Sequence, residues 1–144
     1  MSAAENKRVS RRWHEAWGTP ELQSAYAECL APDFRALFFG MGWVDRNTYL
    51  ERDQEFLRGF SEVRITVEDA VAEEDAVMCR MTWRGMHSHE AAGLAATGAR
   101  FEIMEFAIDR FRDGMVVEHV PLFDQLGLYV QLGLIKDSLA EPAD

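Results

Sequence analysis

The first part of the chain repeats apolar residues at the spacing of a helix. From Glu5 to Trp17 an apolar side chain recurs every four positions: Val9, Trp13 and Trp17. Such a repeat places the side chains on one face of a helix. Thr19 and Pro20 suit the start of a second helix, because threonine caps helix N-termini and proline needs no amide donor in the first turn. That helix would bury Leu22, Tyr26 and Leu30.

Proline and aspartate then interrupt the helical pattern. Pro32-Asp33 ends the second helix, and the apolar segment 34–39 predicts a short strand. Asp45 can cap a third helix that runs to about Gly59. The buried side of this helix would carry Tyr49, Leu50, Phe56 and Leu57.

From Val63 onward the apolar period changes to two, which is the period of a strand. Val63, Ile65 and Val67 alternate with polar residues. Further strands are expected over residues 76–87, 99–112 and 115–123, with a loop at 88–98 and an apolar tail at 126–134 that covers one end of the sheet. Asp113-Gly114 is a strong signal for a two-residue hairpin turn. Helices followed by an antiparallel sheet indicate an α+β fold.

Length and composition fit one domain with enough apolar material to enclose a small molecule. The chain has 144 residues, of which 48% are hydrophobic. A chain of about 150 residues buries roughly two-thirds of its unfolded surface. We therefore expect residues 1–144 to form a single domain with an ordered core over about 5–134. Nine Phe, four Trp and three Tyr can supply both a core and a pocket lining.

Charge and targeting signals narrow the partners. Asp plus Glu number 25 against 15 Lys plus Arg, a net charge of −10. This charge disfavours nucleic acid and anionic membranes, because both need positive potential. The polar start lacks the apolar region of a secretion signal, and no apolar run approaches the roughly 20 residues that span a bilayer. Cys29 and Cys79 have no CxxC-type partner, so a reduced, cytoplasmic protein is expected; a disulfide between them stays open.

Three groups of local motifs occur in a distinctive order. The first is Asn6 to Trp17 followed by Ala31-Pro32-Asp33-Phe34. The second is Arg84-Gly85-Met86-His87 with Gly93 and Thr97-Gly98 after it. The third is Asp113-Gly114-Met115-Val116-Val117-Glu118-His119, then Phe123-Asp124-Gln125-Leu126-Gly127-Leu128 and Gln131-Leu132-Gly133. Together they resemble the SnoaL-like polyketide cyclases (ester cyclases) of the NTF2-like superfamily, over about residues 5–134.

The resemblance implies a cone, in which a curved antiparallel sheet wraps around N-terminal helices and encloses a pocket, usually in a homodimer. Cyclases of this family close a polyketide ring by an aldol-type step without metal or organic cofactor. A pocket Asp, assisted by a His, handles the proton of the carbon nucleophile. Counted from the Asp113-Gly114 turn, the Asp position falls on Pro121 and the His position on Ala107. Neither side chain transfers protons, so this chain departs from the family mechanism at both positions.

Glu105 is the leading candidate for an acid/base residue. A two-residue turn predicts that Glu105 lies opposite Leu122 and Ala107 opposite Val120, and opposed residues share a sheet face. Glu105 would then face the pocket with Ala107. An apolar cavity raises the pKa of a carboxyl group, which suits proton abstraction beside a carbonyl near neutral pH. A glutamate that faces outward, or pairs with arginine, is an equally consistent alternative.

Other polar residues have a structural explanation beside the functional one. Asp124 could pair with Glu105, but capping of the terminal helix is favoured. His14, where relatives often carry a pocket Tyr, could orient a substrate oxygen or share a proton with Glu105; a surface histidine is the alternative. His87 and His89 could both be metal ligands, but no third ligand is evident, and we predict no metal site. His119 is expected to pack or hydrogen-bond within the sheet.

Several aromatic residues could stack on a planar ligand: Trp13, Trp17, Trp43, Trp83, Phe38 and Phe39. Of these we favour Trp83 as pocket-facing, because aromatic residues at regular spacing are usually ordinary core. The predicted catalytic residues are Glu105 and His14. The predicted substrate-binding residues are Trp83, Ala107, Trp13, Trp17, His87, Val120 and Asp124.

The leading hypothesis is a cofactor-independent enzyme of secondary metabolism, such as antibiotic biosynthesis, acting on a small apolar or polycyclic carbonyl compound. Ring closure, isomerisation, epoxide opening and hydroxylation all stay open, because a fold does not fix a function. A non-catalytic binder of a small ligand is the second hypothesis, and Ala107 and Pro121 favour it. A dimeric accessory subunit of another enzyme is the third.

Overall fold

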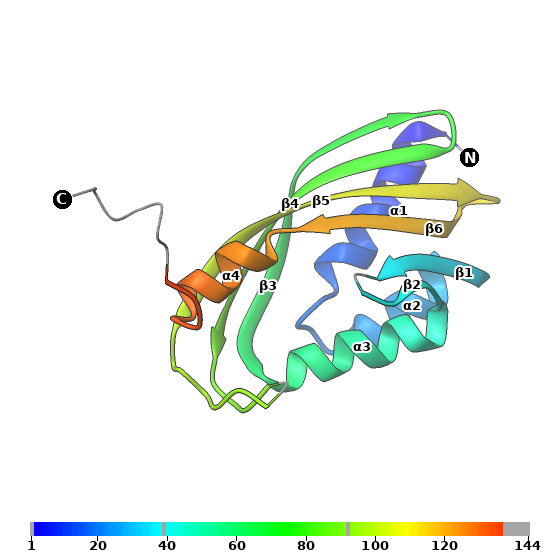
Figure 1. Cartoon of the computed structure of the whole chain (residues 1–144). Helices are drawn as coiled ribbons and strands as arrows, with labels where there is room; N and C mark the ends of the chain where they lie inside the picture. The colour runs from blue at the N-terminus through cyan, green and yellow to red at the C-terminus, as the bar shows by residue number, and fades with distance from the viewer. Residues whose placement is uncertain (1, 39, 92, 137–144) are drawn as a thin grey trace.

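The computed structural model describes residues 2–38, 40–91 and 93–136 (Figure 1). The elements follow one another as α1 (Ala3–Glu15), α2 (Leu22–Cys29), β1 (Leu30–Phe38), β2 (Gly42–Asp45), α3 (Arg46–Arg58), β3 (Phe60–Glu73), β4 (Ala76–His87), β5 (Arg100–Arg112), β6 (Met115–Phe123) and α4 (Gln125–Gln131). None of the described helices is both long and apolar enough to span a membrane.

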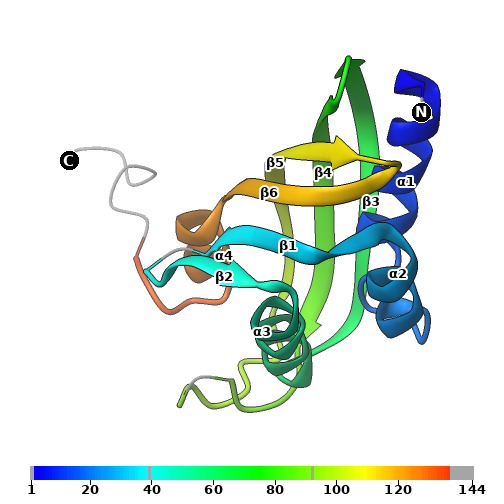
Figure 2. The ribbon, with the colours of Figure 1, turned by 90° about the vertical axis from the view of Figure 1, so that its right-hand side faces the viewer.

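The six described strands form one strongly curved sheet in the order β2-β1-β6-β5-β4-β3 (Figures 1 and 2). The predicted α+β cone is confirmed. The sheet is mixed, however, because β1 runs parallel to β6 while all other neighbouring pairs are antiparallel. Several other elements separate β1 from β6 along the chain, so the two strands need not form an antiparallel hairpin.

Helix α1 begins with a capping box, which the sequence analysis did not use. The Ser2 hydroxyl accepts a hydrogen bond from the Glu5 amide at 3.3 Å, and the Glu5 carboxylate accepts one from the Ser2 amide at 2.7 Å. The buried face carries Asn6, Ser10, Trp13 and His14. Three of these positions, Asn6, Ser10 and His14, are therefore polar groups inside the protein.

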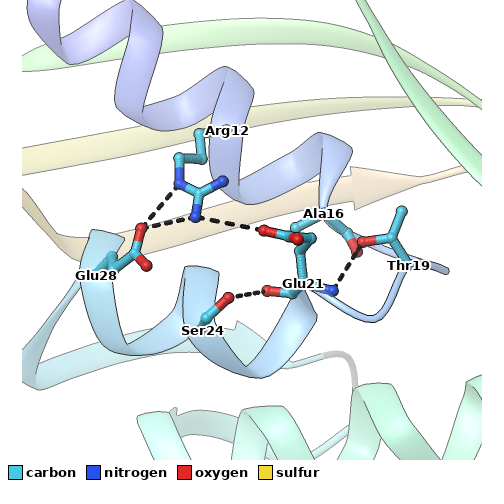
Figure 3. Close-up of polar contacts among 6 residues, drawn as sticks. All are labelled: Arg12, Ala16, Thr19, Glu21, Ser24 and Glu28. Atoms are coloured by element: carbon cyan, nitrogen blue, oxygen red, sulfur yellow. Dashed lines mark hydrogen bonds and ion pairs between the residues drawn. The ribbon is translucent and has the colours of Figure 1, made fainter.

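The corner between α1 and α2 shows why the second helix starts later than predicted. Thr19 caps the turn, because its hydroxyl donates to the Ala16 carbonyl at 2.6 Å and accepts from the Glu21 amide at 3.2 Å (Figure 3). The helix itself begins at Leu22. The Arg12 guanidinium bridges α1 and α2 by binding Glu28 at 2.7 and 2.9 Å. This pair is exposed, so it fixes the angle of the corner more than it stabilises the fold.

Most strand boundaries follow the sequence pattern, although β3 begins at Phe60 and not at Val63. β4 and β6 have the predicted bounds, whereas β1 starts at Leu30, before Pro32, and β2 was not predicted. Pro32 lies in the register shift of β1 between Leu30 and Arg35, where the missing amide costs no ladder hydrogen bond. The Asp113-Gly114 turn has φ values of 52° and 78°, both positive as a type I′ hairpin requires.

The predicted register of the last hairpin was wrong by one residue. Phe111 pairs with Val116 and Arg110 with Glu118, so Val117 is an extra residue in β6. Beyond this bulge Asp109 pairs with His119, Ala107 with Pro121 and Glu105 with Phe123. The inward face of β6 therefore carries His119 and Pro121. Val120, which we predicted to face the pocket, lies on the outer face of the sheet.

The core fills the concave side of the sheet. Odd-numbered residues of β5 are buried beneath the helices, from Phe101 to Phe111. The even-numbered side is the outer face, and large apolar side chains are exposed there: Met78, Met104, Phe106 and Leu122. We refer to these four residues as the outer apolar patch.

Candidate active site

A cavity of about 250 Å³ lies between the inner face of the sheet, β1, α3 and α4. Its wall is largely aromatic: Trp17, Phe38, Tyr49, Phe56, Trp83 and Phe123. Small-molecule sites commonly measure about 300–1,000 Å³, so this cavity suits a compact ligand of a few rings. Its polar wall residues are few and include Glu105 and Asp53.

Glu105 lies in this wall on β5 and is only 4% exposed. Burial raises the pKa of Glu105 to about 7, the positive charge of His14 opposes this rise, and the negative charge of Asp109 adds to it. The alternatives of an outward-facing or arginine-paired side chain do not apply. Glu105 is therefore a carboxyl group that exchanges its proton near neutral pH inside an apolar cavity.

Beneath Glu105 lies a network of buried polar side chains from α1, β5 and β6. Asp109 is its centre, with one carboxylate oxygen accepting from Ser10 at 2.6 Å and contacting His14 Nε2 at 2.9 Å. The other oxygen contacts His119 Nδ1 at 2.8 Å. His119 Nε2 lies 3.9 Å from the Glu105 carboxylate. The network thus connects the cavity wall to the first helix.

The two histidines of this network differ in charge. Burial disfavours the imidazolium of His14, but the Asp109 carboxylate outweighs it and the pKa of His14 is raised. Burial also lowers the pKa of His119, and the positive charge of His14 lowers it further. Burial by itself would raise the pKa of Asp109, yet His14 and the hydrogen bond from His119 hold it well below its usual value. One charged pair, Asp109 with His14, is the result.

A neutral His119 has a defined tautomer. Asp109 is ionised and only accepts hydrogen bonds, so the proton of His119 lies on Nδ1, which faces Asp109. The lone pair of Nε2 then faces Glu105. Because His119 Nε2 can only accept a hydrogen bond, it favours the protonated form of Glu105, which is the form that exists after Glu105 has taken a proton. The network therefore supports Glu105 electrostatically from behind.

Asp53 is a second buried carboxyl group in the cavity, and the sequence analysis missed it. It lies on α3, one turn after Tyr49, and is 4% exposed. The Tyr26 hydroxyl donates a short hydrogen bond to its Oδ2 oxygen. Burial raises the pKa of Asp53 well above its ordinary value; the Tyr26 hydrogen bond opposes this and the charge of Glu105 adds to it. The sequence carried a signal for its burial, because Tyr49, Asp53 and Phe56 have the spacing of one helix face.

Two predicted tryptophans form part of the wall. The ring centroids of Trp17 and Trp83 lie 4.6 Å apart. The indole N–H of Trp83 is buried without a hydrogen-bond partner among the described residues, and it lies close enough to Glu105 to favour its ionised form weakly. Trp83 therefore offers a ligand a free donor next to Glu105.

Most other predicted positions lie outside the cavity wall. Trp13 is core and contacts the rings of His14 and His119 at centroid distances of 4.3 and 4.7 Å. Ala107 is buried beside Pro121, which does line the cavity. His87 is buried near the end of β4, where its Nδ1 atom contacts the Thr97 hydroxyl at 3.1 Å.

The remaining positions have simple structural explanations. Asp124 is exposed and caps α4 by accepting from the Gly127 amide at 2.9 Å, as favoured from the sequence. Trp43 is exposed and lies against Arg35. Phe39 lies outside the described residues. Cys29 and Cys79 are buried free thiols.

Among the described residues, His14, Asp109 and His119 form a set that could hold a metal ion. Two histidines and a carboxylate suit several divalent metals. In the observed geometry, however, both histidine nitrogens point at the Asp109 oxygens and not at a common vacant point. The hydrogen-bonded network accounts for the positions of all three residues.

Fold and site together define a pocket protein of α+β architecture whose aromatic cavity holds buried carboxyl groups. A family model for SnoaL-like polyketide cyclases matches residues 7–132. The chain therefore belongs to the SnoaL-like polyketide cyclase family.

Solved structures agree with this assignment. AclR from Streptomyces galilaeus, provisionally described as a hydroxylase, superposes with a TM-score of 0.83 at 29% identity, covering 94% of this chain and 85% of that one. IdmH from Streptomyces antibioticus, provisionally described as a polyketide cyclase, gives 0.81 at 30% identity, covering 89% and 98%. TsrD from Streptomyces laurentii gives 0.82 at 23% identity, covering 94% and 99%, which shows the fold alone. The comparison with curated proteins gives no match.

The departure from the family pattern now has a structural counterpart. The resemblance, counted from the Asp113-Gly114 turn, led us to expect the family His at position 107 and the family Asp at position 121. In this chain those two positions pair with each other, and the neighbouring inward pair is Asp109 with His119. Compared with the expected pattern, the acid lies on β5 and the histidine on β6. This pair lies one inward pair further from the cavity than positions 107 and 121. Glu105, one pair on the other side of Ala107, lies in the cavity wall instead.

Proposed function

We propose that this protein is a cofactor-independent acid/base enzyme in which Glu105 removes a proton from the carbon next to a carbonyl group. The observation that carries the proposal is the burial of Glu105 in the aromatic wall, with a pKa of about 7 caused by that burial. A base is most effective when its pKa lies near the working pH. About half of the Glu105 side chains are then ionised at neutral pH, and each can both take and return a proton.

The network behind Glu105 has a supporting role in this proposal. Asp109 and His14 keep their charges within the core, and Asp109 fixes the ring and tautomer of His119. His119 Nε2 can then accept hydrogen bonding from protonated Glu105 after a small movement across the 3.9 Å gap. His14 acts on Glu105 through its charge, and it lies behind the cavity wall.

The substrate we propose is a compact, largely apolar carbonyl compound, such as a polyketide-derived ring system of secondary metabolism or antibiotic biosynthesis. The aromatic walls and the volume of about 250 Å³ support a flat ligand of a few rings. IdmH is described as a cyclase and AclR as a hydroxylase, and both reactions can begin with proton removal from an activated carbon. Ring closure is our preferred reaction, with isomerisation, epoxide opening and hydroxylation as relatives of the same first step.

A non-catalytic ligand carrier is the alternative function. It is favoured by Ala107 and Pro121, which cannot transfer protons and stand at the positions to which the resemblance assigns the catalytic His and Asp. A carrier would bind the same ligands and leave them chemically unchanged.

We further propose that two copies of the chain associate through the sheet. The outer apolar patch exposes four large side chains, and Leu122 is 64% exposed. Contiguous apolar surface of this kind commonly marks an interaction site. A reduced, cytoplasmic location fits the two buried thiols and stays a prediction.

Glu105→Gln tests the proposed base. The assay is hydrogen–deuterium exchange at the activated carbon of bicyclic ketones such as 2-tetralone in D₂O, followed by NMR, with binding of the enol analogue 2-naphthol measured by fluorescence. Loss of a general base should lower the exchange rate by about 10²–10⁴-fold. Binding of 2-naphthol should change by only a few-fold, since the shape of the cavity is kept.

Glu102→Gln is the matched control, because Glu102 lies on the same strand but faces outward and pairs with Arg84. It should exchange like the wild type. A Glu105→Gln enzyme of undiminished rate would refute the role of Glu105. A wild-type protein that binds 2-naphthol but catalyses exchange of no ketone would establish the carrier.

A further inference from the structure

The cavity has carboxyl groups on two different elements. Glu105 belongs to β5 in the sheet, and Asp53 belongs to α3, which packs over the sheet. Both side chains are almost fully buried and both form part of the cavity wall. A ligand in the cavity would therefore lie between helix and sheet with one carboxyl group from each.

A hydrogen bond orients the Asp53 side chain, but no cationic side chain pairs with it among the described residues. Among the described residues its hydrogen bonding involves the Oδ2 oxygen, which accepts from the Tyr26 hydroxyl of α2. Tyr26 is itself buried, so this contact is protected from water and fixes the rotamer of Asp53. The neighbouring Arg52 also lines the cavity, but its guanidinium binds Glu55 at 2.8 Å and not Asp53.

Two buried carboxyl groups in one apolar cavity do not ionise together. The charge of either disfavours the charge of the other, and burial disfavours both. The two groups differ in their surroundings: the positive charge of His14 and the indole N–H of Trp83 favour the ionised form of Glu105, whereas no cation among the described residues does the same for Asp53. Asp53 is therefore the group that keeps its proton when Glu105 is ionised.

On the basis of the proposed function, we propose that Asp53 is the proton donor of the site and that Tyr26 is its positioning residue. Glu105 takes the proton from the carbon next to the carbonyl, and the C–H electron pair becomes a carbon–carbon double bond. The carbonyl π pair moves to oxygen, which receives the proton of Asp53. The products are an enol, a neutral Glu105 and an ionised Asp53, so atoms and charge balance.

This assignment fixes the orientation and the class of the substrate. The carbonyl oxygen faces α3 and the reacting carbon faces β5. A neutral ketone can accept the proton of Asp53, whereas a carboxylate at the same place would meet two buried acids, and Arg52, the cation of the described cavity wall, already pairs with Glu55. The structure therefore points to a neutral ketone or 1,3-dicarbonyl compound in which the carbonyl group lies close to an activated C–H bond.

Asp53→Asn and Asp53→Leu separate proton transfer from hydrogen bonding. The asparagine amide can still donate a hydrogen bond, so 2-naphthol binding should stay within a few-fold while 2-tetralone exchange falls by about 10²–10⁴-fold. Leucine removes the donor as well, and 2-naphthol should then lose its advantage in affinity over naphthalene, which has no oxygen. Glu51→Gln, an exposed change on the same helix, is the control and should resemble the wild type in both assays.

Tyr26→Phe tests positioning. It leaves Asp53 in place, so we expect a lower maximal exchange rate with little change in KM for 2-tetralone. Infrared spectroscopy supplies a readout that a merely structural role would not affect. Besides the band of half-protonated Glu105, the wild type should show at pH 7 a C=O stretch of a protonated carboxyl group that is lost in Asp53→Asn, kept in Glu51→Gln and shifted in Tyr26→Phe.

The outcomes distinguish this inference from the proposed function. If Glu105→Gln loses exchange while Asp53→Asn keeps the full rate, Asp53 is not the donor and the role of Glu105 stands. If no ketone undergoes catalysed exchange, the proposed function fails, and the comparison of 2-naphthol with naphthalene still decides whether Asp53 holds a ligand oxygen. An unchanged naphthol preference in Asp53→Leu would overturn the inference.

Discussion

Replacement of Glu105 by glutamine should stabilise the protein, and only above acidic pH. The folded protein holds the pKa of Glu105 at about 7, against an ordinary value of 4.5. Below pH 4.5 the group is protonated in both the folded and the unfolded state and costs nothing. As the pH rises from 4.5 to 7, the unfolded chain ionises first, so the free energy of unfolding decreases. Above pH 7 the loss is complete.

The magnitude follows from the difference between the two pKa values. Each pKa unit corresponds to about 1.4 kcal/mol, so the wild type loses about 3 kcal/mol through Glu105 between pH 4.5 and pH 8. Glutamine has no such loss. Since about 1 kcal/mol changes the melting temperature of a domain of this size by roughly 2–4 °C, Glu105→Gln should melt about 6–12 °C higher than the wild type at pH 8.

Urea unfolding at several pH values measures this difference. The result that counts is the gap between wild type and Glu105→Gln, because carboxyl groups that do not interact with Glu105 titrate alike in both proteins and cancel. The control Glu102→Gln should follow the wild type within about 0.5 kcal/mol at every pH, since that residue is on the surface. A gap that is constant from pH 4.5 to pH 8 would refute the reasoning. A wild type that is less stable than Glu105→Gln at pH 8 would also be consistent with a functional role of Glu105.

Two further predictions concern the network and the outer face. Asp109→Asn removes the carboxylate between His14 and His119. Because this breaks a buried charged pair, the free energy of unfolding, measured in urea at pH 7, should fall by about 3–5 kcal/mol. A decrease of less than about 1 kcal/mol would show that the fold does not need the network. Leu122→Glu places a charge in the outer apolar patch, so analytical ultracentrifugation should show a dimeric wild type and a folded but monomeric variant. A monomeric wild type would contradict the proposed dimer.

Much of the architecture could be predicted from local sequence signals. Asp45 and Asp124 cap helices as predicted, since capping depends on a side chain and the amides that follow it. The Asp113-Gly114 hairpin formed because both residues tolerate positive φ. The strand β2 escaped prediction because its four residues are mostly exposed and carry no alternation. Their conformation depends on pairing with β1.

The candidate site was predicted in part. Glu105 was found because its distance from the turn made it an inward candidate, and it stays inward although its partner is Phe123 and not Leu122. The bulge at Val117 cannot be recognised from spacing, and it decides that His119 faces Asp109. Asp53 was overlooked because a lone acidic residue on a helix is usually solvated, although its helical spacing from Tyr49 and Phe56 places it on the buried side of α3.

The sequence alone determined most of the elements, the family and the sign of the charge, since these depend on local periodicity, short motifs and composition. Tertiary structure decided which acids are buried, which histidine is charged and where the cavity lies. Burial and charge pairing join residues as far apart in the chain as Ser10 and Asp109, and no local pattern records such contacts. A pKa is set by everything around a group, so it exists only once the fold has assembled its neighbours.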